Sequence, residues 1–302
     1  GGRRRVDLHI RGMKKLGATV ELADGYIQAR APKGLTGNKI VFPFVSVGAT
    51  ENAMMAAVCA SGTSQIVNVA REPEITDLAN CLNAMGARIT GQGTDTLTIE
   101  GVTSLSSATH QVVADRVEAG TFIMAAAMSG GSLTVRDIIP HHLDALFDVI
   151  RQTGVGIDVG DNFVTVTADG RYKAQNVETQ AYPGFPTDLQ AQFTAMMCLA
   201  NGVSQISETI FENRFMHVPE LVRMGADISV DGRTAVIRGK EALLAAPVMA
   251  TDLRASVSLV LAGLATAGTT RLSHIYHLDR GYAELEAKLG ACGARLRRIH
   301  KS

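Results

Sequence analysis

Hydrophobic residues follow two contrasting patterns along this chain. Short segments, such as Thr96-Leu97-Thr98-Ile99, alternate polar and apolar residues, which predicts strands with one buried face and one solvated face. Longer segments, residues 122–128 and 255–267, are apolar around almost the whole helix circumference, which predicts helices that are buried on every side. Half-exposed strands combined with buried helices indicate an inside-out α/β arrangement, in which helices gather at the centre and sheets lie outside.

A short glycine-centred motif repeats along the chain. Leu16-Gly17-Ala18-Thr19-Val20 is its first copy, and the glycine recurs at Gly86, Gly154, Gly225 and Gly293, with separations of 69, 68, 71 and 68 residues. A second glycine series, at the ends of Ala/Met/Leu-rich helices, has separations of 69, 71 and 66 residues and consists of Gly62, Gly131, Gly202 and Gly268. Two series with one period predict a repeated unit of about 68 residues, ordered strand, helix, strand, strand, helix.

The repeat divides the chain into two predicted lobes, residues 1–113 and 114–302. In one copy of the unit, the predicted strands are 63–68, 88–90 and 96–99, and the predicted helices are 73–85 and 114–128. The second lobe has room for almost three units, whereas the first has room for fewer than two. If the lobes are alike, we expect the first to be incomplete.

Composition narrows the function classes. The 302 residues include 29 Lys and Arg and 29 Asp and Glu, so the net charge is zero and neither nucleic acid nor a membrane surface is an expected partner. The longest apolar run is too short to span a bilayer. The chain has four widely separated cysteines, of which the first three lie in apolar helical runs: Cys59, Cys81, Cys198 and Cys292. This usage is typical of reduced core thiols in a cytoplasmic protein.

The candidate chemistry centres on Asp188. Two prolines and a glycine precede it, which predicts a rigid irregular segment leading into a helix that starts near Gln190. Thr187 or Asp188 is expected at the N-cap of that helix. Asp188 could be a cap and nothing more, or a proton acceptor. Other charged or turn-forming residues occupy corresponding places in the repeats: Ser46-Val47-Gly48, Asp115-Arg116, Arg214, Asp252 with Arg254, and Asp279-Arg280. The histidines lack companions at metal-ligand spacing, so no metal site is expected.

Several long strings resemble the enolpyruvyl transferases, and in particular the branch that uses UDP-N-acetylglucosamine. They include Arg5-Val6-Asp7-Leu8-His9-Ile10, Val45-Ser46-Val47-Gly48-Ala49-Thr50-Glu51-Asn52, Phe185-Pro186-Thr187-Asp188-Leu189-Gln190, Phe211-Glu212-Asn213-Arg214, Thr251-Asp252-Leu253-Arg254 and Leu278-Asp279-Arg280-Gly281. The resemblance covers this whole chain and about the C-terminal three-quarters of the family's length. It implies two lobes, each an inside-out α/β barrel of three repeated units, with the active site between them.

The resemblance also implies an activity: transfer of the enolpyruvyl group of phosphoenolpyruvate to the 3-hydroxyl of UDP-N-acetylglucosamine, with release of phosphate. This reaction is the first committed step of peptidoglycan precursor synthesis, so the expected location is the bacterial cytoplasm. No cofactor is implied, and we expect a monomer. Residues 1–113 would form the sugar-nucleotide side, and residues 114–302 would carry the catalytic aspartate and the arginines.

Roles follow for individual residues by the same resemblance. Asp188 would accept the proton of the attacking hydroxyl, and Asp252 would lie near the reacting carbon. Arg280 and Arg4 would hold the anionic groups of phosphoenolpyruvate, while Arg214 and Arg254 would order the cleft. The sugar nucleotide would be contacted at its diphosphate by Ser46, Val47 and Gly48, at its uracil end by Asp7 and Leu8, and elsewhere by Ile210 and Phe211.

The sequence departs from the family in ways that leave alternatives open. The family carries a mobile cysteine loop before the Arg-x-Val-Asp-Leu-His segment, and none of the cysteines here can replace its proton donor. Phe44 stands where the family usually has a lysine. The chain as given is therefore expected to be inactive alone. The alternatives are a non-catalytic UDP-sugar-binding paralogue, a 3-phosphoshikimate 1-carboxyvinyltransferase, and a repeat-built ring clamp, which the neutral charge disfavours.

Overall fold

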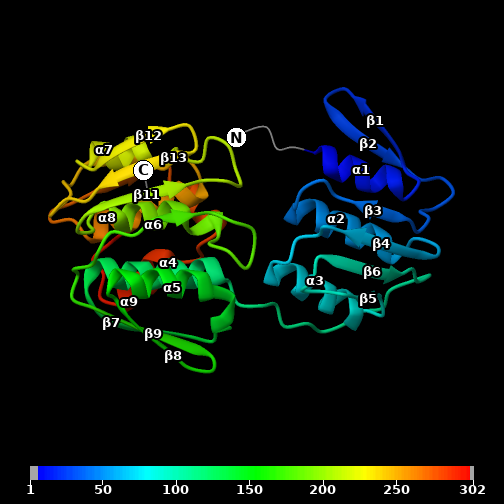
Figure 1. The fold of residues 1–302 in the computed structure, drawn as a ribbon, viewed down its shortest axis with the longest axis horizontal. Coiled ribbons are helices and arrows are strands. Elements are labelled where there is room, and N and C mark those ends of the chain that lie inside the picture. Colours follow the sequence, from blue (N-terminus) through cyan, green and yellow to red (C-terminus); the bar gives the residue numbers. More distant parts are fainter. Residues whose placement is uncertain (1–5, 300–302) are drawn as a thin grey trace. The chain divides into compact units, whose positions relative to one another are not determined.

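The computed structural model describes residues 6–299 of the chain. The fold comprises two compact units, residues 1–113 (unit 1) and 114–302 (unit 2) (Figure 1). Arg4, one of the predicted substrate-binding residues, lies outside the described residues.

In its described part, residues 6–113, unit 1 combines a hairpin, three helices and a four-stranded sheet. Its elements are α1 (Asp7–Lys15), β1 (Thr19–Ala23), β2 (Tyr26–Arg30), β3 (Lys39–Val41), α2 (Val47–Val58), β4 (Thr63–Val67), α3 (Pro73–Ala84), β5 (Arg88–Thr90) and β6 (Thr96–Glu100). The sheet has the order β3-β4-β6-β5, with β3 parallel to β4 and the other pairs antiparallel. Helix α2 packs against β4 and β6, and α3 packs against β5. The inward residues of the strands, including Ile66 and Leu97, are fully buried, as the alternation predicts.

Unit 2 contains three sheets around helical layers. Its helices are α4 (Arg116–Ser129), α5 (Asp144–Thr153), α6 (Gln190–Met197), α7 (Val218–Arg223), α8 (Leu253–Leu264) and α9 (Leu285–Ala291), with 3-10 turns η1 (Pro140–Leu143), η2 (Thr187–Leu189) and η3 (Ile275–Arg280). Its strands are β7 (Gly131–Arg136), β8 (Gly156–Val159), β9 (Phe163–Ala168), β10 (Val177–Glu178), β11 (Val203–Ser207), β12 (Asp227–Asp231), β13 (Thr234–Arg238), β14 (Pro247–Met249) and β15 (Arg271–Ser273). The sheets have the orders β7-β9-β8, β10-β11-β13-β12 and β14-β15.

The inside-out arrangement is confirmed in unit 2. Helices α4, α6 and α8 pack on one another (Figure 1). Every residue of α6 is buried. The strands alternate instead, so that Val164 and Val166 of β9 are buried while the residues between them are less so. A helix enclosed on all sides can be apolar all round, whereas a sheet with one solvated face cannot. The copy of the repeat predicted at residues 63–128 corresponds to β4, α3, β5, β6 and α4.

The same close backbone contact occurs in two copies of the repeat. Gly101 follows β6 and donates its N–H to the carbonyl of Gly62 at 2.9 Å, while Gly239 follows β13 and donates to Gly202 at 3.0 Å. A Cβ atom at Gly101 would lie 1.5 Å from the Ala60 carbonyl oxygen. Neither position has room for any side chain, so glycine is required for close approach rather than for an unusual backbone angle.

The cysteine prediction is partly wrong. Cys198 is buried in the core, but Cys81 is half-buried and Cys59 is exposed. Cys59 is the C-cap of α2, and its side chain is exposed although Val58 and Ala60 on either side of it are buried. Within residues 6–299, no helix is both long and apolar enough to cross a membrane, and no group of three or more potential metal ligands occurs.

Candidate active site

Asp188 is held by two buried anchors on either side of it. Phe185 is buried and packs edge-to-face on Phe193 of α6, with ring centroids 5.5 Å apart. Leu189 is fully buried, and its amide donates to the Pro186 carbonyl at 3.0 Å to close the η2 turn. The expected N-cap is wrong, because no side-chain cap bond is made at η2 or at α6. The tight η2 turn instead directs Thr187 and Asp188 toward arginines.

The Asp188 carboxylate lies between two guanidinium groups. Arg214 donates from Nη2 to Oδ1 at 2.5 Å, and Arg254 donates from Nη2 to Oδ2 at 3.0 Å. The Asp188 side chain is 37% exposed. Burial disfavours its charged form, but the charges and hydrogen bonds of Arg254 and Arg214 outweigh burial and lower the pKa of Asp188 below its ordinary value. Asp188 is thus a fully ionised carboxylate with both oxygens engaged.

Arg214 has three partners that fix its plane. Its Nη1 donates to the Thr187 hydroxyl at 2.9 Å, and its guanidinium carbon lies 4.7 Å from the centre of the Phe211 ring. Stacking on an aromatic face favours a planar cation, so Phe211 and Asp188 hold it from two directions. Asn213 adopts a left-handed conformation with φ of 55° just before the arginine, a conformation that asparagine tolerates well.

Arg254 is placed by the start of α8. Asp252 is the N-cap of this helix, where its Oδ1 accepts from the amides of Arg254 at 2.8 Å and Ala255 at 2.9 Å. The Asp252 carboxylate thus caps α8, and the ion pair of Arg254 is made with Asp188 rather than with Asp252. Burial acts to lower the pKa of Arg254, but Asp188 outweighs it and raises that pKa.

A buried hydrogen-bond network that the sequence did not reveal lies behind these residues. Gln192 of α6 donates from Nε2 to the Thr121 hydroxyl and to the Asp188 carbonyl, both at 3.1 Å. The hydroxyls of Thr121 and Tyr282 are 2.9 Å apart. Burial raises the pKa of Tyr282, which keeps its phenol neutral. The available signal was a pair of glutamines inside an otherwise apolar helix, because such groups need buried partners.

Arg280 is not part of this cluster. It ends η3, which packs on α8, and its side chain is exposed with no hydrogen-bonding or ion-pair partner among residues 6–299. Arg298 donates two hydrogen bonds to the carboxylate of the neighbouring Asp279, at 2.9 and 2.6 Å. The Asp279–Arg298 pair anchors the segment that carries Arg280.

Unit 1 brings its two predicted nucleotide-binding segments together. Ser46 caps α2, with its hydroxyl accepting from the Ala49 amide at 3.4 Å, and a Cβ at Gly48 would lie 3.4 Å from the His9 ring. The starts of α1 and α2 therefore lie side by side. Val47 is exposed, whereas Leu8 is buried in the unit 1 core. Asp7 adjoins a surface hollow of about 510 Å³ lined also by Ile10, Arg11, Lys14 and Lys15.

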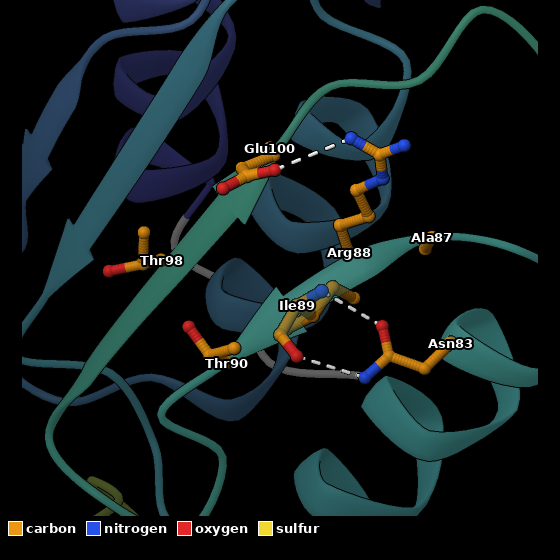
Figure 2. Close-up of a pocket in the computed structure, with 7 residues that line it drawn as sticks. All are labelled: Asn83, Ala87, Arg88, Ile89, Thr90, Thr98 and Glu100. Atoms are coloured by element: carbon orange, nitrogen blue, oxygen red, sulfur yellow. Dashed lines mark hydrogen bonds and ion pairs between the residues drawn. The ribbon is translucent and has the colours of Figure 1, made fainter.

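A second hollow in unit 1, of about 390 Å³, lies at the edge of the sheet (Figure 2). The Asn83 amide satisfies both backbone groups of Ile89 on edge strand β5, at 2.9 and 2.8 Å. Arg88 pairs with Glu100 at 3.5 Å on the exposed face. These groups are engaged with one another, and Asn83 occupies the edge where another strand would pair. We assign this hollow no catalytic role.

His217 is a buried group next to the cluster. Burial lowers its pKa to about 4, Asp252 acts in the opposite direction, and Arg214 lowers it further. Its Nε2 has no hydrogen-bond partner within the described part of the chain. His217 is therefore neutral in the folded protein at neutral pH.

We expect this histidine to make unit 2 less stable in mild acid. The unfolded state, with a histidine pKa of about 6.5, binds a proton that the folded state accepts only near pH 4. Stability thus falls as the pH drops from about 6.5 to 4, and the loss is about 2 kcal/mol at pH 5. Urea unfolding between pH 8 and 5 measures this loss. His217→Asn should flatten the dependence, whereas His274→Asn, at an exposed left-handed position, should preserve it. An unchanged slope in His217→Asn would contradict the assignment.

Comparisons with known proteins agree on one family. The sequence model of EPSP synthase (3-phosphoshikimate 1-carboxyvinyltransferase) matches residues 2–289. A UDP-N-acetylglucosamine 1-carboxyvinyltransferase of Caulobacter sp. (strain K31) is 57% identical over 299 residues, which are 99% of this chain and 69% of that protein. One from Rhizobium etli (strain ATCC 51251 / DSM 11541 / JCM 21823 / NBRC 15573 / CFN 42) is 57% identical over 300 residues, 99% of this chain and 70% of that protein.

Solved structures give the same answer for the fold. The enolpyruvyl transferase NikO from Streptomyces tendae matches with a TM-score of 0.87 at 27% identity, covering 98% of this chain and 73% of that chain. An EPSP synthase from Acinetobacter baumannii matches with a TM-score of 0.74 at 16% identity, covering 99% of this chain and 72% of that chain, and this likeness concerns the fold alone.

The fold and the matches define a transferase of the enolpyruvyl (1-carboxyvinyl) class, built from inside-out α/β repeats. The chain belongs to the EPSP synthase family of enolpyruvyl transferases, and within it to the group of the UDP-N-acetylglucosamine 1-carboxyvinyltransferases.

Proposed function

We propose that this chain supplies the catalytic aspartate and the arginines for enolpyruvyl transfer from phosphoenolpyruvate to the 3-hydroxyl of UDP-N-acetylglucosamine, in the synthesis of peptidoglycan precursors. In this reaction a bond forms between the sugar oxygen and the enolpyruvyl carbon, the bond from that carbon to the phosphate oxygen breaks, and phosphate leaves. The observation that carries the proposal is Asp188 between Arg214 and Arg254, in a chain 57% identical to transferases of that name.

Asp188 is the proposed acceptor of the hydroxyl proton. A general base must be unprotonated and within hydrogen-bond reach of the proton it takes. Asp188 meets the first condition, because the two arginines lower its pKa. In the structure each of its oxygens accepts one hydrogen bond from an arginine, and we propose that one of these arginines turns away when substrate binds. Phosphoenolpyruvate has a phosphate and a carboxylate, and either anion would compete for a guanidinium group.

Movement of an arginine away from Asp188 would also change the pKa of this proposed base. Each arginine that leaves Asp188 for a substrate anion removes a positive charge from its carboxylate, which raises its pKa and makes it a better proton acceptor. Arg280 is the proposed further contact for these anions, because it is exposed and follows Asp279, which Arg298 binds. In unit 1, Asp7, Ser46, Val47 and Gly48 remain the proposed contacts to the nucleotide, with the backbone of Leu8.

The test is phosphate release from phosphoenolpyruvate that depends on UDP-N-acetylglucosamine, measured on protein produced from the full reading frame that contains this sequence. We expect release with the sugar nucleotide and none with shikimate 3-phosphate. The opposite acceptor preference would overturn the proposal. Calorimetric binding of the sugar nucleotide without any turnover would instead favour the non-catalytic paralogue, whose motivation is Phe44 at a position where the family usually has a lysine.

A further inference from the structure

Glu208 is a buried carboxylate that joins two parts of the site in unit 2. It directly follows β11, is 1% exposed, and is anchored by its own amide, which donates to the Arg233 carbonyl at 2.8 Å. Its Oε2 accepts from the Thr187 hydroxyl at 2.8 Å. Its Oε1 accepts from the amides of Ile210 at 3.0 Å and Phe211 at 2.9 Å. A buried carboxylate persists only when such donors stabilise it.

The groups that donate to Glu208 belong to the candidate active site. Thr187 also accepts from Arg214 at 2.9 Å, and the other Nη of that arginine binds Asp188. On the other side, Ile210 and Phe211 are the residues proposed to lie against the sugar nucleotide. Glu208 therefore binds both the loop at residues 210–211, through its two amides, and the Thr187 hydroxyl.

The chemistry of a carboxylate sets the direction of every bond in this chain. Glu208 accepts from two amides through Oε1, and the Thr187 hydroxyl points its hydrogen at Oε2. Its lone pairs then face Arg214, which donates to them. With one end fixed on Thr187 and its face on Phe211, the guanidinium group has a single orientation that reaches Asp188.

We propose that Glu208 is a positioning residue that couples the loop at residues 210–211 to Asp188, acting through Thr187 and Arg214. The inference rests on the proposed function, because it assigns Glu208 to the same site. A sugar nucleotide that settles on Ile210 and Phe211 shifts the amides that Glu208 holds, and Arg214 follows. Substrate binding at the loop thereby sets whether Arg214 stays on Asp188 or turns to a substrate anion.

Matched variants separate this role from a structural one. Thr187→Val keeps the shape but removes the hydroxyl, whereas Thr187→Ser keeps the hydroxyl and serves as the control. Glu208→Gln can still accept from the loop amides, but its NH₂ group then faces Thr187 and can no longer take that hydrogen. We expect Thr187→Val and Glu208→Gln to lower kcat about ten- to a hundredfold with little change in KM for the sugar nucleotide, as loss of orientation does. Thr187→Ser restores the hydroxyl and should recover most of the kcat that Thr187→Val loses.

A second readout does not depend on turnover. In Thr187→Val and Glu208→Gln, a loosened Arg214 should let the pKa of Asp188 rise toward its ordinary value, as followed by carbon NMR of the carboxyl group, and Thr187→Ser should not change it. If the parent protein shows no turnover, the proposed function fails, while this titration still decides the coupling. An unchanged pKa of Asp188, or equal losses in Thr187→Val and Thr187→Ser, would overturn the role of Glu208.

Discussion

Replacing Asp188 by asparagine is expected to lower kcat by about 10²- to 10⁴-fold, the usual contribution of a positioned general base. Asparagine has nearly the same shape but cannot take a proton at neutral pH. Its amide oxygen can still accept from one arginine, while its NH₂ group must face the other. Because Phe185 and Leu189 fix the η2 turn independently of the carboxylate, the variant should remain folded.

Steady-state phosphate release from the full-reading-frame protein measures this loss. Asp169→Asn is the matched control, because Asp169 is an exposed carboxylate that accepts from the Arg171 amide at 2.9 Å, a bond that asparagine can also accept. Sugar-nucleotide binding should persist in Asp188→Asn, which separates lost chemistry from lost structure. If Asp188→Asn keeps more than about a tenth of kcat, Asp188 is not the proton acceptor.

The sequence allowed good prediction of the fold, because the fold depends on a periodic signal. Two glycine series and the contrast between alternating strands and apolar helices were sufficient to predict the repeat unit and its inside-out packing. The ends of helices were less predictable. Asp188 has the residue type and the neighbours of an N-cap, yet the chain makes a 3-10 turn there, and tertiary ion pairs override the local preference.

The site could be predicted only as a set of residues, not as an arrangement. Arg214 is 26 positions from Asp188 and Arg254 is 66 positions away, so no local rule pairs them. Asp252 is nearer to Arg254 in sequence, but the start of α8 uses that carboxylate for its own amides. Glu208 went unnoticed because a glutamate after a strand is ordinarily solvated, and only the fold shows that it is buried.

Replacing Gly239 by alanine is expected to destabilise unit 2 by about 3 kcal/mol or more, at the upper end of the range for overpacking. The added Cβ would lie 1.7 Å from the Ala200 carbonyl oxygen, and backbone atoms cannot turn aside as a side chain can. Moving the strand away would break the bonds from Gly239 to Gly202, at 3.0 Å, and from Lys240 to Cys198, at 2.8 Å. Scanning calorimetry should show the melting temperature of unit 2 lowered by about 10 °C.

Gly290→Ala, in the same unit, is expected to raise stability rather than lower it. Gly290 lies in α9, its backbone angle is ordinary, and nothing lies within 4 Å of an added Cβ, so alanine should stabilise by about 0.5–1 kcal/mol. The same substitution thus has opposite signs at two glycines, depending on the space around each. Gly101→Ala should repeat the damage in unit 1, because its Cβ would meet the Ala60 carbonyl oxygen at 1.5 Å. If Gly239→Ala proved as stable as Gly290→Ala, the repeat would not need this close backbone contact.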